Sequence, residues 1–134
     1  MQKWHYNQQM TISQVVVFFE RNNITYTKTM IQHYVRIQLL PPPLQKRYYT
    51  HAHLQMLFII NHLKEVFALD EIKALFALAE NYPTEQIYKH FTDLITNTEL
   101  HTNNNFLNTM ALMCKSVELK KAAAEKLKAS LFKW

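Results

Sequence analysis

The chain has 134 residues, of which 49% are apolar, and it contains no glycine. An average chain of this length carries roughly nine glycines. Walker loops and dinucleotide-binding loops need glycine where the backbone approaches phosphate, so the composition excludes both. It also disfavours hairpin-rich sandwiches and barrels, whose tight turns rely on glycine. We therefore expect a compact all-α fold.

The formal net charge is +5, and all of this excess lies in the first half of the chain. Residues 22–63 contain no Asp or Glu, but they include Lys28, Arg36, Lys46 and Arg47. An acid-free basic stretch is a candidate surface for a polyanion such as nucleic acid. It is equally compatible with a solvated basic face that has no ligand.

The composition also indicates a cellular compartment. Cys114 is the single cysteine, which excludes an internal disulfide and is typical of a reducing environment. The longest uninterrupted apolar run has six residues, far fewer than the roughly 20 that span a bilayer. The first residues lead into no signal-peptide apolar region. We expect a cytoplasmic protein with no membrane association.

Helix caps are easily identified at the start of the chain. Thr11 and Gln14 match a capping box, which predicts a first helix that runs to about Arg21. Asn22 and Asn23 follow, and asparagine is the residue that best replaces glycine in a left-handed turn. The sequence therefore predicts a short turn between the first helix and the next.

The second helix has a clear start and a proline stop. Thr27 is its expected cap, and apolar spacing predicts a helix from Lys28 to about Leu39. Pro41, Pro42 and Pro43 cannot continue it. Because Gln38 is not a glycine, we expect the helix to run on until the prolines rather than end in a left-handed cap.

The rest of the chain is also predicted to be helical. Thr50 caps a third helix of about fourteen residues, whose apolar positions recur with helical period. Asn81-Tyr82-Pro83 marks the clearest boundary in the chain. The remaining predictions are a fourth helix from roughly Leu69 to Ala79, a fifth from about Thr84 to Ile95, a polar loop from Thr96 to Asn105 and a long last helix.

This order of elements resembles a winged helix-turn-helix. The stretch from Met30 to Pro42 is similar to the second helix and exit of the MerR-like DNA-binding domain, with Tyr34, Leu39, Leu40 and Pro42 on the Tyr, Leu pair and Pro of its pattern. Arg47-Tyr48-Tyr49 matches the wing, and Tyr49 is expected to pack the wing against the third helix. Residues 27–35 also resemble a bacterial family of small uncharacterised proteins with a MerR-like core.

The resemblance covers about residues 8–80. It implies a MerR-like winged helix-turn-helix domain with a minimal wing over residues 1–80, and a helical dimerisation lobe over residues 81–134. In this arrangement the second helix enters the major groove and the wing contacts the DNA backbone. The residues expected at double-stranded DNA are Lys28, Thr29, Gln32, His33, Arg36, Lys46, Arg47 and Tyr48.

Gln32 is the residue expected to contact a base in this DNA-binding arrangement. Its amide can pair with adenine, so it is the candidate base reader. The MerR-like pattern has a DNA-contacting arginine at this position, so Lys28 and Arg36 would have to supply the charge. The missing arginine is also the main argument for an alternative function, a protein-interaction module derived from a helix-turn-helix.

The last helix carries a heptad pattern. Its apolar positions alternate between spacings of four and three and are interrupted at Lys120. By resemblance this helix would pair two subunits in a homodimer; the alternative is an amphipathic helix folded back onto its own domain. The expected dimerisation residues are Phe106, Met110, Met113, Val117, Leu127 and Leu131.

The sequence shows no catalytic or metal centre. His51 and His53 are two apart, a spacing that points their rings to different sides of a helix. Zinc needs three or four convergent ligands, so we expect no metal and no cofactor. Cys114 lies on an apolar helix stripe and is expected to be a core residue. The sequence thus predicts a homodimeric DNA-binding transcription regulator rather than an enzyme, and it identifies no small-molecule effector.

Overall fold

A computed structural model describes residues 9–79, 82–96 and 105–131 of the chain. Within these ranges the fold is all-α, with two isolated β-bridges and no strand. The helices are α1 (Ile12–Arg21), α2 (Lys28–Arg36), α3 (His51–Leu63), α4 (Leu69–Leu78), α5 (Thr84–Thr96) and α6 (Asn105–Leu131). The polar loop predicted between α5 and α6 lies largely outside the described residues.

The predicted start of α1 is confirmed. Thr11 is the N-cap: its backbone N–H donates to Gln14 Oε1 at 2.9 Å, and the Gln14 N–H donates to Thr11 Oγ1 at 3.4 Å. After the helix, Asn23 has a φ of 61°, in the left-handed region. The Asn22 side chain donates to the Phe18 carbonyl at 2.8 Å. The two asparagines therefore turn the chain as expected without glycine.

The start of α2 is confirmed and its predicted end is wrong. Thr27 Oγ1 accepts from the Met30 N–H at 3.1 Å, but the helix ends at Arg36 instead of near Leu39. Gln38 has a φ of 64°, so it occupies the left-handed cap that the sequence analysis disfavoured. The Gln38 N–H donates to the Val35 carbonyl, and the Leu39 N–H donates to the Tyr34 carbonyl. This is the Schellman arrangement.

Burial explains why the chain accepts a left-handed glutamine. Leu39 and Leu40 are each only 2% exposed, and the turn at Gln38 directs both into the core. Burying a leucine side chain stabilises a fold by about 1.5–3 kcal/mol, whereas a left-handed non-glycine residue costs about 1–2 kcal/mol. The gain from two leucines exceeds the cost at one glutamine.

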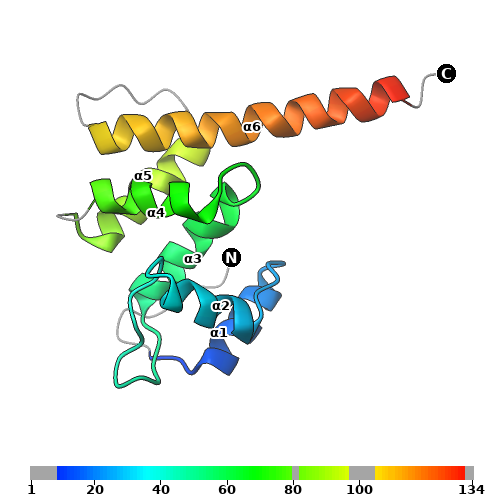
Figure 1. Ribbon diagram of the computed structural model, residues 1–134. Coiled ribbons are helices and arrows are strands. Elements are labelled where there is room, and N and C mark those ends of the chain that lie inside the picture. Colours follow the sequence, from blue (N-terminus) through cyan, green and yellow to red (C-terminus); the bar gives the residue numbers. More distant parts are fainter. Residues whose placement is uncertain (1–8, 80–81, 97–104, 132–134) are drawn as a thin grey trace.

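Helix α3 is the central element of the fold. Nine of its thirteen residues are buried, and α5 and α6 both pack against it (Figure 1). Among the described residues, buried apolar side chains from Met10 to Val117 form a continuous core. Helices α1 and α2 lie at the opposite end of the molecule from α6 (Figure 1). None of the described helices has both the length and the apolar character needed to cross a membrane.

Helix α6 divides into a packed part and an exposed part. The side chains of Phe106, Met110, Met113 and Val117 are 0–8% exposed, and α6 packs on α3, α4 and α5. These four expected dimerisation residues are therefore buried within their own chain, as in the fold-back alternative. Residues 118–127 are all exposed, including Leu127 at 64%, and this end of α6 extends beyond the other helices (Figure 1). The Leu131 side chain lies outside the described part.

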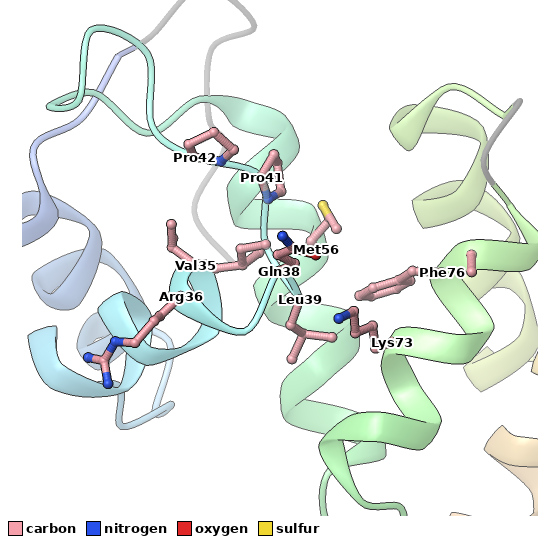
Figure 2. Close-up of a pocket in the computed structure, with 11 residues that line it drawn as sticks. Val35, Arg36, Gln38, Leu39, Pro41, Pro42, Met56, Lys73 and Phe76 are labelled. Carbon is pink, nitrogen blue, oxygen red and sulfur yellow. The ribbon is translucent and has the colours of Figure 1, made fainter.

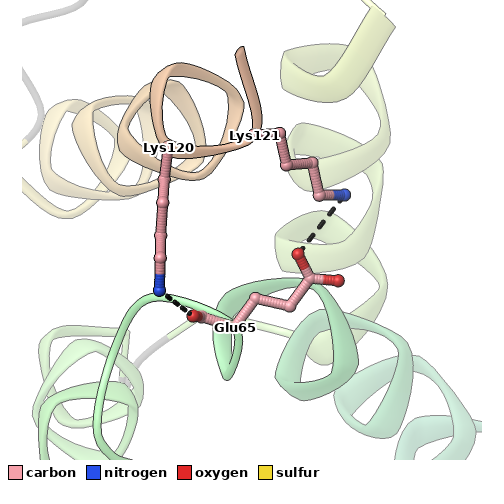
Figure 3. A network of polar contacts seen from close by, with 3 residues as sticks. All are labelled: Glu65, Lys120 and Lys121. Carbon is pink, nitrogen blue, oxygen red and sulfur yellow. Dashed lines mark hydrogen bonds and ion pairs between the residues drawn. The ribbon is translucent and has the colours of Figure 1, made fainter. Parts of the chain in front are cut away.

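Lys120, which interrupts the heptads, has an intramolecular contact. Its Nζ donates to the Glu65 backbone carbonyl at 3.0 Å, and the Lys121 Nζ lies 3.5 Å from the Glu65 carboxylate (Figure 3). Glu65 follows the C-terminal end of α3, where carbonyl groups leave a partial negative charge that a cation stabilises. The two lysines hold α6 against the turn after α3.

Candidate nucleic-acid interface

Helix α2 has one buried face and one exposed polar face. Ile31 and Tyr34 are 0% and 4% exposed, and Met30 is half-buried, as the apolar spacing predicted. The opposite face is open to solvent over the length of the helix. All five of its candidate DNA-binding residues are exposed: Lys28, Thr29, Gln32, His33 and Arg36.

Buried tyrosines hold α2 in place. The Tyr34 ring packs edge-on against Tyr26 with centroids 6.1 Å apart, and the Tyr26 hydroxyl donates to the Leu57 carbonyl in α3 at 2.7 Å. Burial raises the pKa of both phenols, so both stay protonated at neutral pH. The exposed face of α2 is thereby fixed relative to α3.

The wing loop, residues 41–49, ends in a tight hairpin. The Leu44 N–H donates to the Tyr48 carbonyl at 2.8 Å, and the Tyr48 N–H donates back to the Leu44 carbonyl at 2.9 Å. Gln45 and Lys46 take up the turn with φ values of 53° and 59°. Lys46 and Arg47 at the tip are exposed, and the Arg47 guanidinium lies 5.6 Å from the half-buried Tyr48 ring.

Tyr49 anchors the wing loop, as the sequence analysis expected. It is 5% exposed, and its ring packs edge-on against His53 of α3 with centroids 5.1 Å apart. Its backbone forms a bridge with Met10, with hydrogen bonds of 2.7 and 2.9 Å. The loop is therefore attached to both α3 and the segment before α1.

His53 supplies a second anchor that the sequence analysis missed. Its Nδ1 accepts from the Thr50 backbone N–H at 2.9 Å, while Nε2–H donates to the Pro41 carbonyl at 3.0 Å. These roles require the neutral ring. Burial lowers the pKa of His53, and the bonds to the Pro41 and Pro42 carbonyls oppose that shift only in part. The available signal was the spacing, because His53 stands where a capping box has Glu or Gln.

Two other potentially reactive side chains, His51 and Cys114, are buried in the core. His51 is 7% exposed; burial lowers its pKa, and Glu85 at the start of α5 opposes that shift. Burial raises the pKa of the Cys114 thiol to about 12, so the thiol stays protonated. In the described ranges, no three His, Cys, Asp or Glu side chains are grouped so that they could hold a metal ion.

The candidate cations are available to a ligand. Lys28, Arg36, Lys46 and Arg47 are all exposed, and none forms an ion pair within the described part of the chain. All four come from the segment without acidic residues, at the end of the molecule away from α6 (Figure 1). Four unneutralised cations on two adjoining segments of the chain can bind a polyanion.

Comparison with known proteins gives a family without an assigned activity. No curated protein and no solved structure matches the chain. Residues 6–91, more than half of the chain, match a family model and include α1 to α4 and the wing loop. The chain therefore belongs to the family described as Domain of unknown function (DUF1836).

Proposed function

We propose that the protein binds double-stranded DNA as a homodimeric transcription regulator, with α2 in the major groove and the wing loop on the backbone. One observation carries the proposal: α2 buries one face and exposes Lys28, Gln32 and Arg36 on the other, inside a segment without acidic residues. A polar helix face held by a packed second helix is the arrangement with which helix-turn-helix proteins read DNA.

Phosphate neutralisation supplies most of the expected affinity. Lys28 and Arg36 lie at the two ends of α2, and Lys46 and Arg47 lie at the tip of the wing loop. Each cation that contacts a phosphate releases condensed counterions, so affinity depends steeply on salt. The ring of Tyr48 beside Arg47 restricts the guanidinium and favours a fixed register on the backbone.

The exposed polar residues of α2 would recognise the DNA bases. Gln32 carries an amide that can pair with N6 and N7 of adenine. Thr29 and His33 flank it on the same exposed face and can contact neighbouring bases or phosphates. The proposed roles are therefore base contact for Gln32 and positioning for the cations.

The exposed end of α6 supports the homodimer. Leu119 and Leu127 are 61% and 64% exposed, and every residue of α6 from 118 to 127 is exposed. Isolated helical segments of this length are marginal in water, and a second copy would bury the exposed leucines. The proposed seam thus uses the C-terminal part of α6, because the earlier heptad positions are buried within the chain.

Fluorescence anisotropy with a random-sequence duplex tests the proposal. At about 50 mM salt the protein should bind, and Lys46→Ala with Arg47→Ala should weaken binding about tenfold or more. The matched control is Lys89→Ala with Lys115→Ala, which removes the same charge from exposed positions on α5 and α6 outside the proposed seam and should change affinity about twofold or less. Absence of binding by the folded protein at this salt would refute DNA binding.

The alternative function is a protein-interaction module. Gln32 stands where the MerR-like pattern has its DNA-contacting arginine, which is the observation that favours it. The two proposals differ in their response to Gln32→Ala. A DNA reader should lose its preference for one duplex over another while keeping its affinity for random duplex. A protein-interaction module should show no duplex preference to lose.

A further inference from the structure

A groove separates the C-terminal end of α2 from α4. It is open to solvent and has a volume of about 900 Å³. Residues 35, 36 and 38–42 line one side, and Lys73, Phe76 and Ala77 of α4 line the other (Figure 2). Met56 of α3 also lines it. Its volume lies within the range of small-molecule sites. The groove involves neither the base-reading residues of α2 nor the tip of the wing loop.

The lining is mainly apolar and its charges have one sign. Leu39, Met56 and Phe76 contribute apolar surface, while Arg36 and Lys73 are the charged lining residues and both are basic. Figure 2 shows the Lys73 amine directed toward Leu39, whereas the Arg36 guanidinium points away from Lys73. Lys73 is exposed and forms no ion pair within the described ranges. The groove therefore presents the Lys73 amine beside an apolar wall.

The end of α2 adds a polar group without adding negative charge. Gln38 holds a left-handed backbone conformation and lines the groove. The carbonyls of Tyr34 and Val35, which would otherwise be free at this helix end, accept hydrogen bonds from the residues that follow. The negative end of the helix is thus largely neutralised, and the Gln38 amide can donate to an anion.

We propose that this groove binds a small organic carboxylate with an apolar body. The carboxylate lies beside the Lys73 amine and the Gln38 amide, and the apolar body packs on Leu39, Met56 and Phe76. The groove is complementary in charge to an anion, because its two charged lining residues are basic and none is acidic. Together with the apolar wall, this selects an amphipathic anion over a neutral or cationic molecule.

Binding there has a consequence that rests on the proposed DNA-binding function. The groove adjoins Arg36, one of the four cations expected at the DNA backbone. A bound carboxylate would offset positive charge beside this residue and weaken phosphate binding. Occupancy should therefore lower the affinity for random duplex by about threefold.

The test uses the full chain labelled with nitrogen-15 and follows amide shifts during titration. The probe is 2-naphthoate, with neutral 2-naphthalenemethanol as its uncharged counterpart. Naphthoate should shift the amides of residues 35–39, 73 and 76 with a Kd below about 1 mM, and the alcohol should bind about tenfold more weakly. Lys73→Gln should weaken naphthoate binding about fivefold or more. The matched control is Lys89→Gln, on an exposed position of α5 outside the groove, which should leave binding unchanged.

Three results would overturn the proposal. They are equal affinity for the acid and the alcohol, shifts outside the groove, and binding that Lys73→Gln leaves intact in a folded protein. A titration with an acetylated peptide of alternating glutamate and leucine distinguishes a small-molecule site from a protein-docking surface. If the peptide binds the groove and naphthoate does not, the groove is a protein-docking surface. Naphthoate binding requires no DNA, so the two proposals can fail separately. If the protein binds naphthoate but no duplex, the carboxylate site stands and the proposal of DNA binding is refuted.

Discussion

The left-handed backbone at Gln38 gives a sharp test of how a chain without glycine closes its turns. Gln38 has a φ of 64° at the position where a Schellman motif favours glycine. Its backbone N–H donates to the Val35 carbonyl at 3.1 Å, so the conformation is held by the turn itself. Gln38→Gly should relieve the clash of the β-carbon without changing these hydrogen bonds.

The expected gain follows from two opposing effects. A left-handed non-glycine residue costs about 1–2 kcal/mol, which the substitution removes. Glycine makes the unfolded chain more flexible, which costs about 0.5–1 kcal/mol. The free energy of unfolding should therefore rise by about 0.5–1 kcal/mol, and Tm by about 2–4 °C.

Urea unfolding followed by circular dichroism measures this change, with two controls. Gln38→Ala removes the side chain but keeps the β-carbon, so it should leave the free energy of unfolding nearly unchanged. Gln32→Gly places glycine inside α2 and should lower it by about 1 kcal/mol. If Gln38→Gly destabilises the protein as much as Gln32→Gly does, the backbone at position 38 is not left-handed in solution and the reasoning fails.

Four further predictions concern buried groups. His53→Leu leaves the Thr50 N–H and the Pro41 carbonyl without their partner, so it should lower the free energy of unfolding by about 1–3 kcal/mol, against almost no change for exposed His33→Leu. Because burial lowers the pKa of His53, the neutral ring stabilises the fold fully above about pH 6.5, and this contribution should decline as the pH falls below that value. Urea titrations should therefore give a lower free energy of unfolding at pH 5 than at pH 7.5, and His53→Leu should make this difference smaller. Met110→Ala should cost about 2–5 kcal/mol of the free energy of unfolding while exposed Leu127→Ala costs almost nothing at protein concentrations where the chain is monomeric; equal costs would contradict the packing of α6. Cys114, 1% exposed with a pKa of about 12, should react with a thiol reagent about a hundredfold more slowly in the native protein than in urea, and equal rates would place the thiol outside the core.

Local signals predicted the helices well where a side chain closes the first turn. Thr11 and Thr27 cap α1 and α2 as expected, and α4 and α5 begin at Leu69 and Thr84 as expected. The end of α2 was predicted wrongly because the energy that decides it is not local. The burial of Leu39 and Leu40 outweighs the strain at Gln38, and only the tertiary structure shows that both leucines reach the core.

The role of the last helix shows a second limit of sequence patterns. A heptad seam and a face buried against the same chain have the same apolar spacing, so Phe106 and Val117 could be read either way. The structure buries both within the chain and leaves Leu127 exposed. The contact of Lys120 with the Glu65 carbonyl could not be predicted either, because the two residues are brought together only when α6 packs on the turn after α3.

The candidate site was predictable in part. The spacing of Ile31 and Tyr34 indicated which face of α2 is buried and hence that Lys28, Gln32 and Arg36 are exposed. The groove between α2 and α4 could not be predicted, since its apolar wall combines residues from three parts of the chain. Gln38 also lines the groove, and its left-handed conformation was not predicted from the sequence.

The salt dependence of duplex binding tests the central claim most directly. With about four phosphate contacts in each of two chains, a plot of log K against log salt concentration should have a slope near −7. Lys46→Ala with Arg47→Ala removes two contacts from each chain and should reduce the slope to about −4. A steep slope that shallows in this way supports DNA binding through α2 and the wing loop. A folded protein that fails to bind at about 50 mM salt, or binds with a slope that the double substitution leaves unchanged, would contradict it.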